Sequence, residues 1–185
     1  MHHVNIRLPG RVDDGTGPDG IRPGTGWTIT DSKIEAYVGT TSSLEHQDLI
    51  QGYGNYFIKV SRSEFINSGD AQVNFSVSSG LLHHIQVFNN VFRNTVDNMG
   101  TVALRMYADT TLSGFEEVVI ANNTFIDWAK TASSYGAAIR LHNNGTQTTA
   151  VNARLQNNII YNCGDAWPAI LVQGITPNWT ISNNL

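Results

Sequence analysis

Short stretches of this chain alternate apolar and polar residues and then reach a pair of small polar residues. The clearest stretch, residues 83–92, alternates as far as Phe88, continues with Asn89 and Asn90, and then becomes apolar again. Alternation with a period of two predicts a β-strand. An Asn pair directly after it predicts a turn, because Asn tolerates left-handed backbone and hydrogen-bonds its neighbours. The pattern therefore predicts short strands separated by tight turns.

The same phrase recurs along the whole chain. The other copies are residues 27–34, 58–65, 118–125, 153–160 and 179–185. A repeat of about 30 residues with variable spacing is typical of a solenoid, in which insertions lie in loops. Each unit of a solenoid buries its apolar face against its neighbours. The repeat therefore predicts a stack of similar coils.

Aligning the copies places a small polar residue in one column. Its members are Ser32, Ser63, Asn90, Asn123, Asn158 and Asn184. In a stack of parallel strands about 4.8 Å apart, equivalent residues lie above one another. Their side-chain amides can then hydrogen-bond along the stack as a ladder. The alternative is that each Asn only suits its own turn.

A second alternating strand recurs with the same period. Its copies are residues 19–22, 48–51, 72–77, 103–107, 138–142 and 169–173. Strand side chains alternate between two faces, so the apolar positions are expected inside. The outward column is then Arg22, Gln51, Asn74, Arg105, Arg140 and Leu171. Two positions further along, a second outward column contains Tyr53, Ser76, Tyr107, His142 and Gln173.

The repeated phrase resembles the right-handed parallel β-helix of the pectate-lyase and polygalacturonase superfamily, over nearly the whole chain. We therefore expect an all-β protein, a single-stranded right-handed parallel β-helix (solenoid) of about six coils, with residues 1–185 as one domain. Solenoids normally need polar caps, yet the last phrase reaches Leu185. We expect a domain that lacks one or both end caps, and hence a homo-oligomer or further domains of a longer chain.

The composition narrows the classes of partner. The net charge is −4 and 14% of the residues are charged, which argues against nucleic acid as the main partner. No apolar run approaches the length of a membrane span, so we expect no membrane partner. No basic and apolar segment typical of a signal peptide opens the chain, although we expect a secreted or extracellular protein.

The outward face of the second strand is the candidate binding surface. The candidate substrate-binding residues are Arg22, Gln51, Tyr53, Asn74, Tyr107 and His142. Arg105 and Arg140, which lie on the same face, are candidate catalytic residues. Arg forks match the geometry of carboxylates, and Tyr rings pack against sugar rings. These residues favour an acidic polysaccharide as partner. The alternative is a solvated sheet face on which Arg serves solubility.

Acidic residues lie where the chain turns into that strand. Asp48 and Asp19 occupy matching places one coil apart, and His46 precedes Asp48. Two such acids can bind Ca²⁺ together with Asp13 or Asp14, because Ca²⁺ takes several oxygen ligands. They can also act as an acid and base pair, and His46 titrates near neutrality. The alternative is ordinary turn capping by Asp.

The resemblance implies a reaction class. Lyases of this superfamily remove a proton beside a uronate carboxylate with Arg or Lys as the base and neutralise that carboxylate with Ca²⁺, whereas its hydrolases use clustered aspartates. The resemblance thus implies Arg105 or Arg140 as base, and Asp19 and Asp48 as metal ligands. With Asp48 and His46 as acid or base, the protein is a candidate polysaccharide lyase or glycoside hydrolase. The competing hypothesis is a noncatalytic scaffold or glycan-binding module, as in tailspikes and adhesins.

Overall fold

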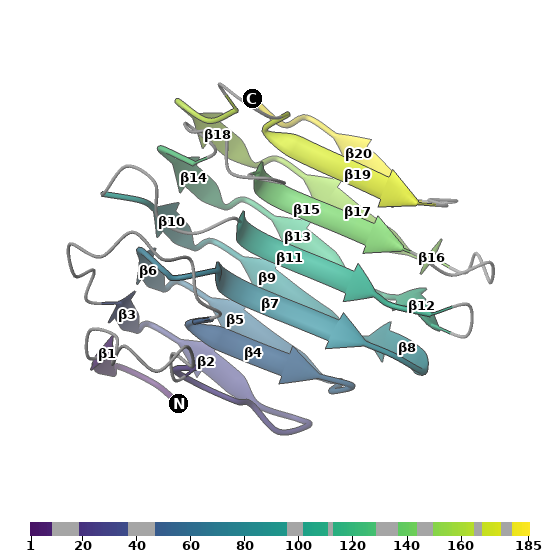
Figure 1. Ribbon diagram of the computed structural model, residues 1–185, viewed down its shortest axis with the longest axis horizontal. Coiled ribbons are helices and arrows are strands. Elements are labelled where there is room, and N and C mark those ends of the chain that lie inside the picture. The colour runs from purple at the N-terminus through teal and green to yellow at the C-terminus, as the bar shows by residue number, and fades with distance from the viewer. Residues whose placement is uncertain are drawn as a thin grey trace.

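The computed structural model describes residues 1–8, 19–36, 47–95, 102–110, 113–128, 137–143, 150–164, 168–174 and 179–185. Within these ranges the protein consists of β-strands and turns, without a helix, and its strands pair in parallel (Figure 1). The prediction of an all-β parallel solenoid is therefore confirmed. Within the same ranges, no helix has the length and apolarity that crossing a membrane requires.

The strands form four sheets along the solenoid (Figure 1). The first sheet contains β1 (Asn5–Leu8), β3 (Lys33–Ala36), β6 (Glu64–Ile66), β10 (Val91–Arg93), β14 (Thr124–Ile126) and β18 (Ile159–Tyr161). The second contains β4 (Ile50–Tyr53), β7 (Ala71–Val77), β11 (Val102–Ala108), β15 (Ala137–Asn143) and β19 (Ile170–Gly174). The third contains β8 (Gly80–His83), β12 (Ser113–Glu116) and β16 (Ala150–Val151). The fourth contains β2 (Thr28–Thr30), β5 (Ile58–Ser61), β9 (Ile85–Phe88), β13 (Val119–Ala121), β17 (Ala153–Gln156) and β20 (Trp179–Ser182).

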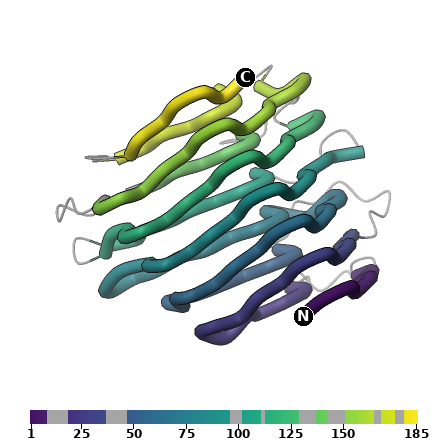
Figure 2. Tube along the Cα trace, turned by 180° about the vertical axis from the view of Figure 1, so that it is seen from behind, coloured from purple at the N-terminus to yellow at the C-terminus, as the bar shows by residue number. Residues whose placement is uncertain are grey.

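The coils stack in chain order, so the two ends of the chain lie at opposite ends of the stack (Figure 2). The solenoid has about four complete turns, slightly fewer than the expected six coils. Partial turns at its ends bring the first and fourth sheets to six strands each.

The turn between the fourth and first sheets explains why the repeated phrase contains two small polar residues. The first residue of the pair adopts the left-handed conformation, with φ between 49° and 56°, in Asp31, Arg62, Asn89, Asn122, Asn157 and Asn183. Asn is the residue after Gly that best tolerates this conformation. The second residue points inward, because the turn reverses the alternation. Each Asn pair therefore supplies one turn former and one interior amide.

The interior amides form the predicted ladder. Asn123 Oδ1 accepts hydrogen bonds from the backbone N–H and the Nδ2 of Asn90, both at 3.0 Å. Asn158 Oδ1 accepts the same two bonds from Asn123, both at 3.0 Å. Asn184 Oδ1 accepts them from Asn158 at 3.0 and 2.9 Å. These contacts join neighbouring coils, so the residues do more than suit their own turns.

Serine continues the ladder toward the N-terminus. The backbone N–H of Ser63 donates to Asn90 Oδ1 at 3.0 Å, and that of Ser32 donates to Ser63 Oγ at 3.2 Å. Val4 N–H donates to Ser32 Oγ at 3.3 Å. A hydroxyl can therefore replace the amide as acceptor, although it cannot also bridge to the next side chain in the same way.

The core fills the space between the sheets with the alternating apolar residues. Phe65, Phe92 and Phe125 are fully buried and occupy one register position of the first sheet. Their rings stack with centroids 5.0 and 4.8 Å apart. The apolar positions of the second sheet are likewise buried, in Ile50, Val73, Leu104 and Ile139. The intervening side chains of this sheet point away from that core, although some of them, such as Asn74, are covered by neighbouring residues.

Candidate functional site

The register of the second sheet aligns the residues of the predicted outward column. Gln51 pairs with Asn74, Asn74 with Arg105, Arg105 with Arg140, and Arg140 with Leu171. The second predicted column, from Tyr53 through Ser76, Tyr107 and His142 to Gln173, pairs in the same strands. Arg22 follows the isolated bridge between Ile21 and Ile50, so it extends the first column by one coil.

A groove of about 420 Å³ runs over these columns. Its lining residues are Gln51, Tyr53, Asn74, Ser76, Arg105, Tyr107, Asp109 and Arg140. Six of these were predicted from the sequence, whereas Arg22 and His142 do not line the groove itself. β4, β7, β11 and β15 each contribute lining residues, so the groove crosses the strands and follows the stacking direction. We call it the β4–β15 groove.

Arg105 is held by a carboxylate that the sequence did not reveal. Its two terminal nitrogens lie 2.8 and 2.9 Å from the oxygens of Asp70, in a bidentate pair. Both side chains are largely buried, with exposed fractions of 15% and 14%. Such a pair fixes the guanidinium geometrically and balances its charge. Arg105 is therefore a rigid part of the groove wall, and its predicted role as base stays a prediction.

Arg140 contacts Gln173 and His142. Its Nε donates to Gln173 Oε1 at 3.0 Å, and one terminal nitrogen lies 3.1 Å from His142 Nδ1. The His142 ring meets the Tyr107 ring edge-on, with centroids 4.6 Å apart. The three predicted residues Arg140, His142 and Tyr107 thus form one cluster, in which Arg140 and Tyr107 line the groove and Gln173 helps to orient Arg140.

Asp109 is a further groove residue that the sequence analysis missed. It follows Ala108 at the end of β11, two positions after Tyr107, so continued alternation beyond the strand end is the signal that points to it. Burial raises the pKa of Tyr107, and so do the hydrogen bond and the charge of Asp109. The phenol consequently stays protonated at neutral pH and can donate or accept a hydrogen bond.

Asp48 lies beneath the groove rather than in it. Its side chain is fully buried and accepts hydrogen bonds from Ala71 N–H at 2.9 Å, Asn74 Nδ2 at 2.8 Å and Gln51 Nε2 at 3.3 Å. Asn74 is itself buried, and its Oδ1 has no hydrogen-bond partner within the described ranges. Asp48 therefore positions two groove amides, and its predicted role as acid, base or metal ligand stays a prediction.

The predicted calcium ligands have other partners. Asp19 forms an ion pair with Arg22 at 2.6 Å, and its Oδ1 accepts the backbone N–H of Asp48 at 3.2 Å. Ca²⁺ takes six to eight oxygens, and a neighbouring cation together with complete burial of Asp48 fits such a site poorly. His46, Asp13 and Asp14 lie outside the described residues.

No known protein family, curated protein or solved structure matches this chain. The case for a function consequently depends on the groove and on the chemistry of its lining.

Proposed function

We propose that the β4–β15 groove binds an acidic polysaccharide. The observation that supports this proposal is one groove that brings together two Arg, two Tyr and two side-chain amides over successive coils. The resemblance of the repeat to the pectate-lyase and polygalacturonase superfamily supports the same class of ligand. A polysaccharide ligand also agrees with the extracellular location that we propose.

The direction of the groove suits a chain-like ligand. Parallel strands repeat about every 4.8 Å, so each coil offers a new set of side chains at about the spacing of successive sugar rings. Tyr53 and Tyr107 alternate with the smaller Ser76 in one column. Aromatic faces next to a small residue leave room for a ring to pack. A polysaccharide that lies along the stack contacts each coil in turn. Each contact contributes little binding energy, but the contributions of successive coils add up.

The polar lining suits hydroxyl and carboxylate groups. Arg140 supplies charged donors, which pair with carboxylates more strongly than neutral donors do. Gln51 and Asn74 present amides positioned by Asp48. Asn74 Oδ1 is a buried acceptor that lacks a partner within the described ranges, and such atoms call for an explanation. A sugar hydroxyl that reaches it after a small side-chain movement satisfies it.

Lyase activity is the second candidate function. The observation that favours it is the cluster of Arg140, His142 and Tyr107. A uronate carboxylate held by Arg140 brings its α-proton near the His142 imidazole, which can accept it, while the protonated Tyr107 phenol can donate a proton to the glycosidic oxygen that leaves as the C–O bond breaks. No step proposed here uses calcium, because Asp19 and Asp48 fit that ion poorly.

A polysaccharide panel separates binding from turnover. The intact protein is mixed with polygalacturonate, alginate and hyaluronan as acidic chains, and with dextran and arabinan as neutral ones. We expect calorimetric binding to at least one acidic chain that weakens as salt is added, because partly exposed ion pairs are screened. If the protein is a lyase, the absorbance of unsaturated uronate ends increases with time. If it is a hydrolase, new reducing ends form without that absorbance. Equal binding of neutral and acidic chains, or no binding to any of them, contradicts the proposal.

A further inference from the structure

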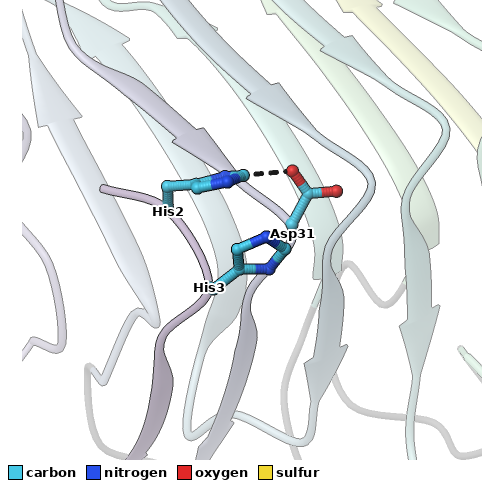
Figure 3. Close-up of side chains that lie close together, drawn as sticks. All are labelled: His2, His3 and Asp31. Carbon is cyan, nitrogen blue, oxygen red and sulfur yellow. Dashed lines mark ion pairs between the residues drawn. The ribbon is translucent and has the colours of Figure 1, made fainter.

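Two histidines and an aspartate converge at the N-terminal end of the solenoid (Figure 3). His2 Nδ1 lies 3.1 Å from Asp31 Oδ2, and the ring centroids of His2 and His3 are 3.7 Å apart. One ligand atom from each residue lies within 4.8 Å of the other two. Within the described ranges, this is the one such group of three or more His, Cys, Asp or Glu side chains.

The backbone places these residues together before any ligand arrives. His2 forms an isolated bridge with Thr30, and His3 N–H donates to Thr30 O at 3.3 Å. Thr30 N–H in turn donates to Met1 O at 3.1 Å. The two histidines therefore precede β1 while Asp31 lies in the turn after β2, one coil away. Both His side chains are exposed.

Asp31 is prepared to act as an anionic ligand. Hydrogen bonds from Arg62 hold the pKa of its carboxyl well below its ordinary value, although burial acts in the opposite direction. A hydrogen bond from Thr30 and the charges of Arg62 and His2 lower the pKa further. The Arg62 Nε lies 2.7 Å from Oδ1 and a terminal nitrogen lies 2.6 Å from Oδ2. Thr30 Oγ1 also donates to Oδ2, at 3.0 Å. Each carboxylate oxygen has two lone pairs, so a metal can take the second lone pair of Oδ1 while Arg62 orients Asp31 as an outer partner.

We propose that His2, His3 and Asp31 bind a divalent transition-metal ion of the Zn²⁺ type, with water completing its coordination. Two imidazoles and one carboxylate suit Zn²⁺ and its neighbours, whereas Ca²⁺ and Mg²⁺ prefer oxygen ligands alone. An open hollow of about 590 Å³ lies beside the cluster and is lined in part by His3, Asp31 and Arg62, so an ion and its waters can enter. The positive charge of Arg62 weakens the site relative to a closed structural zinc site.

A bound ion joins the first strand to the next coil. Since the ligands come from two coils, they meet only in the folded chain, and an ion that binds only the folded chain raises its stability. The proposed role is thus a clip on the N-terminal end of the solenoid. It does not depend on the polysaccharide proposal, because the cluster lies in the turn between the fourth and first sheets.

The test is a Zn²⁺ titration of the intact chain prepared without a histidine tag. Calorimetry should show one equivalent bound, and Zn²⁺ should raise the melting temperature, whereas Ca²⁺ should do neither. The variant H2Q/H3Q should lose at least tenfold in Zn²⁺ affinity together with the thermal shift, and Asp31→Asn should do the same. Because both histidines are exposed, H2Q/H3Q is expected to fold normally, which circular dichroism checks.

The chain offers a matched control in its other adjacent histidine pair. His84 Nε2 lies 2.7 Å from Glu117, and His83 lies beside His84. The variant H83Q/H84Q should keep the affinity and the thermal shift. Absence of Zn²⁺ binding by the wild type overturns the proposal. So does a loss of binding in H83Q/H84Q that equals or exceeds the loss in H2Q/H3Q.

Discussion

Replacing Asn123 by Leu tests the amide ladder at a central coil. The two side chains are similar in size, so the substitution removes hydrogen bonds without opening a large cavity. Asn123 is fully buried. Its Oδ1 accepts the backbone N–H of Asn90 at 3.0 Å, and its Nδ2 donates to Val87 O at 2.9 Å. Leu leaves both of these buried backbone groups without that partner.

The magnitude follows from these two groups. A buried donor or acceptor that loses its partner costs about 1–3 kcal/mol, so Asn123→Leu should lower the free energy of unfolding by about 2–6 kcal/mol. Small domains are stable by only about 5–15 kcal/mol, so the change is easy to detect. Asn123→Ser should lower the free energy of unfolding by less, because a hydroxyl in the ladder can accept a hydrogen bond from a backbone N–H. Ser63 Oγ accepts such a bond from the backbone N–H of Ser32 at 3.2 Å.

Equilibrium unfolding in urea, followed by circular dichroism, measures the change. Gln86→Leu is the matched control, because it makes the same kind of amide-to-Leu change on the exposed face of the neighbouring strand β9. Surface substitutions of this kind usually change stability by less than about 0.5 kcal/mol. If Asn123→Leu unfolds at the same urea concentration as Gln86→Leu, the ladder does not stabilise the coils and the reasoning is wrong.

Two further predictions concern the core and the N-terminal turn. Phe92→Ala should lower the free energy of unfolding in urea by about 3–5 kcal/mol, because it removes the central ring of a buried stack. Phe57→Ala, at an exposed position, is the control. An equal loss of stability in the two variants refutes the prediction. Arg62 lowers the folded pKa of Asp31, so the stabilisation from this pair is present above the ordinary pKa of 3.8 and is lost as the pH falls through the folded value. Without metal, the stability gap between wild type and Asp31→Asn should therefore shrink on acidification, and a gap independent of pH argues against the pairing.

The sequence predicts those parts of the fold that repeat. The ladder occurs at the same place in every copy of the phrase, and the outward column occurs at the same place in every copy of the second strand. Insertions in the loops leave both registers intact. The repeat alone thus predicts that Asn90 and Asn123 lie in the interior and that Arg105 and Arg140 lie on one face. The alternation also explains the left-handed turn residue that precedes each ladder residue.

The sequence does not predict contacts that occur in a single coil. Asp70 lies in a turn one coil away from Arg105, and no repeat marks it as a partner. Asp48 looks like an exposed turn residue, yet it is fully buried because Gln51 and Asn74 close over it with hydrogen bonds. Such contacts depend on loop paths and side-chain rotamers, which periodicity does not determine. The candidate chemistry is therefore less predictable than the fold that presents it.

The central claim is that the β4–β15 groove binds an acidic polysaccharide, and Arg140→Ala tests it most directly. Arg154, exposed in β17 of the fourth sheet, provides the same substitution on another face. Calorimetry against the best acidic chain of the panel should show that Arg140→Ala loses about 1–3 kcal/mol of binding free energy, or about 5- to 150-fold in Kd, because charge-assisted hydrogen bonds are removed. Arg154→Ala should bind like the wild type. Equal affinities for wild type and Arg140→Ala, or equal losses in the two variants, contradict the claim.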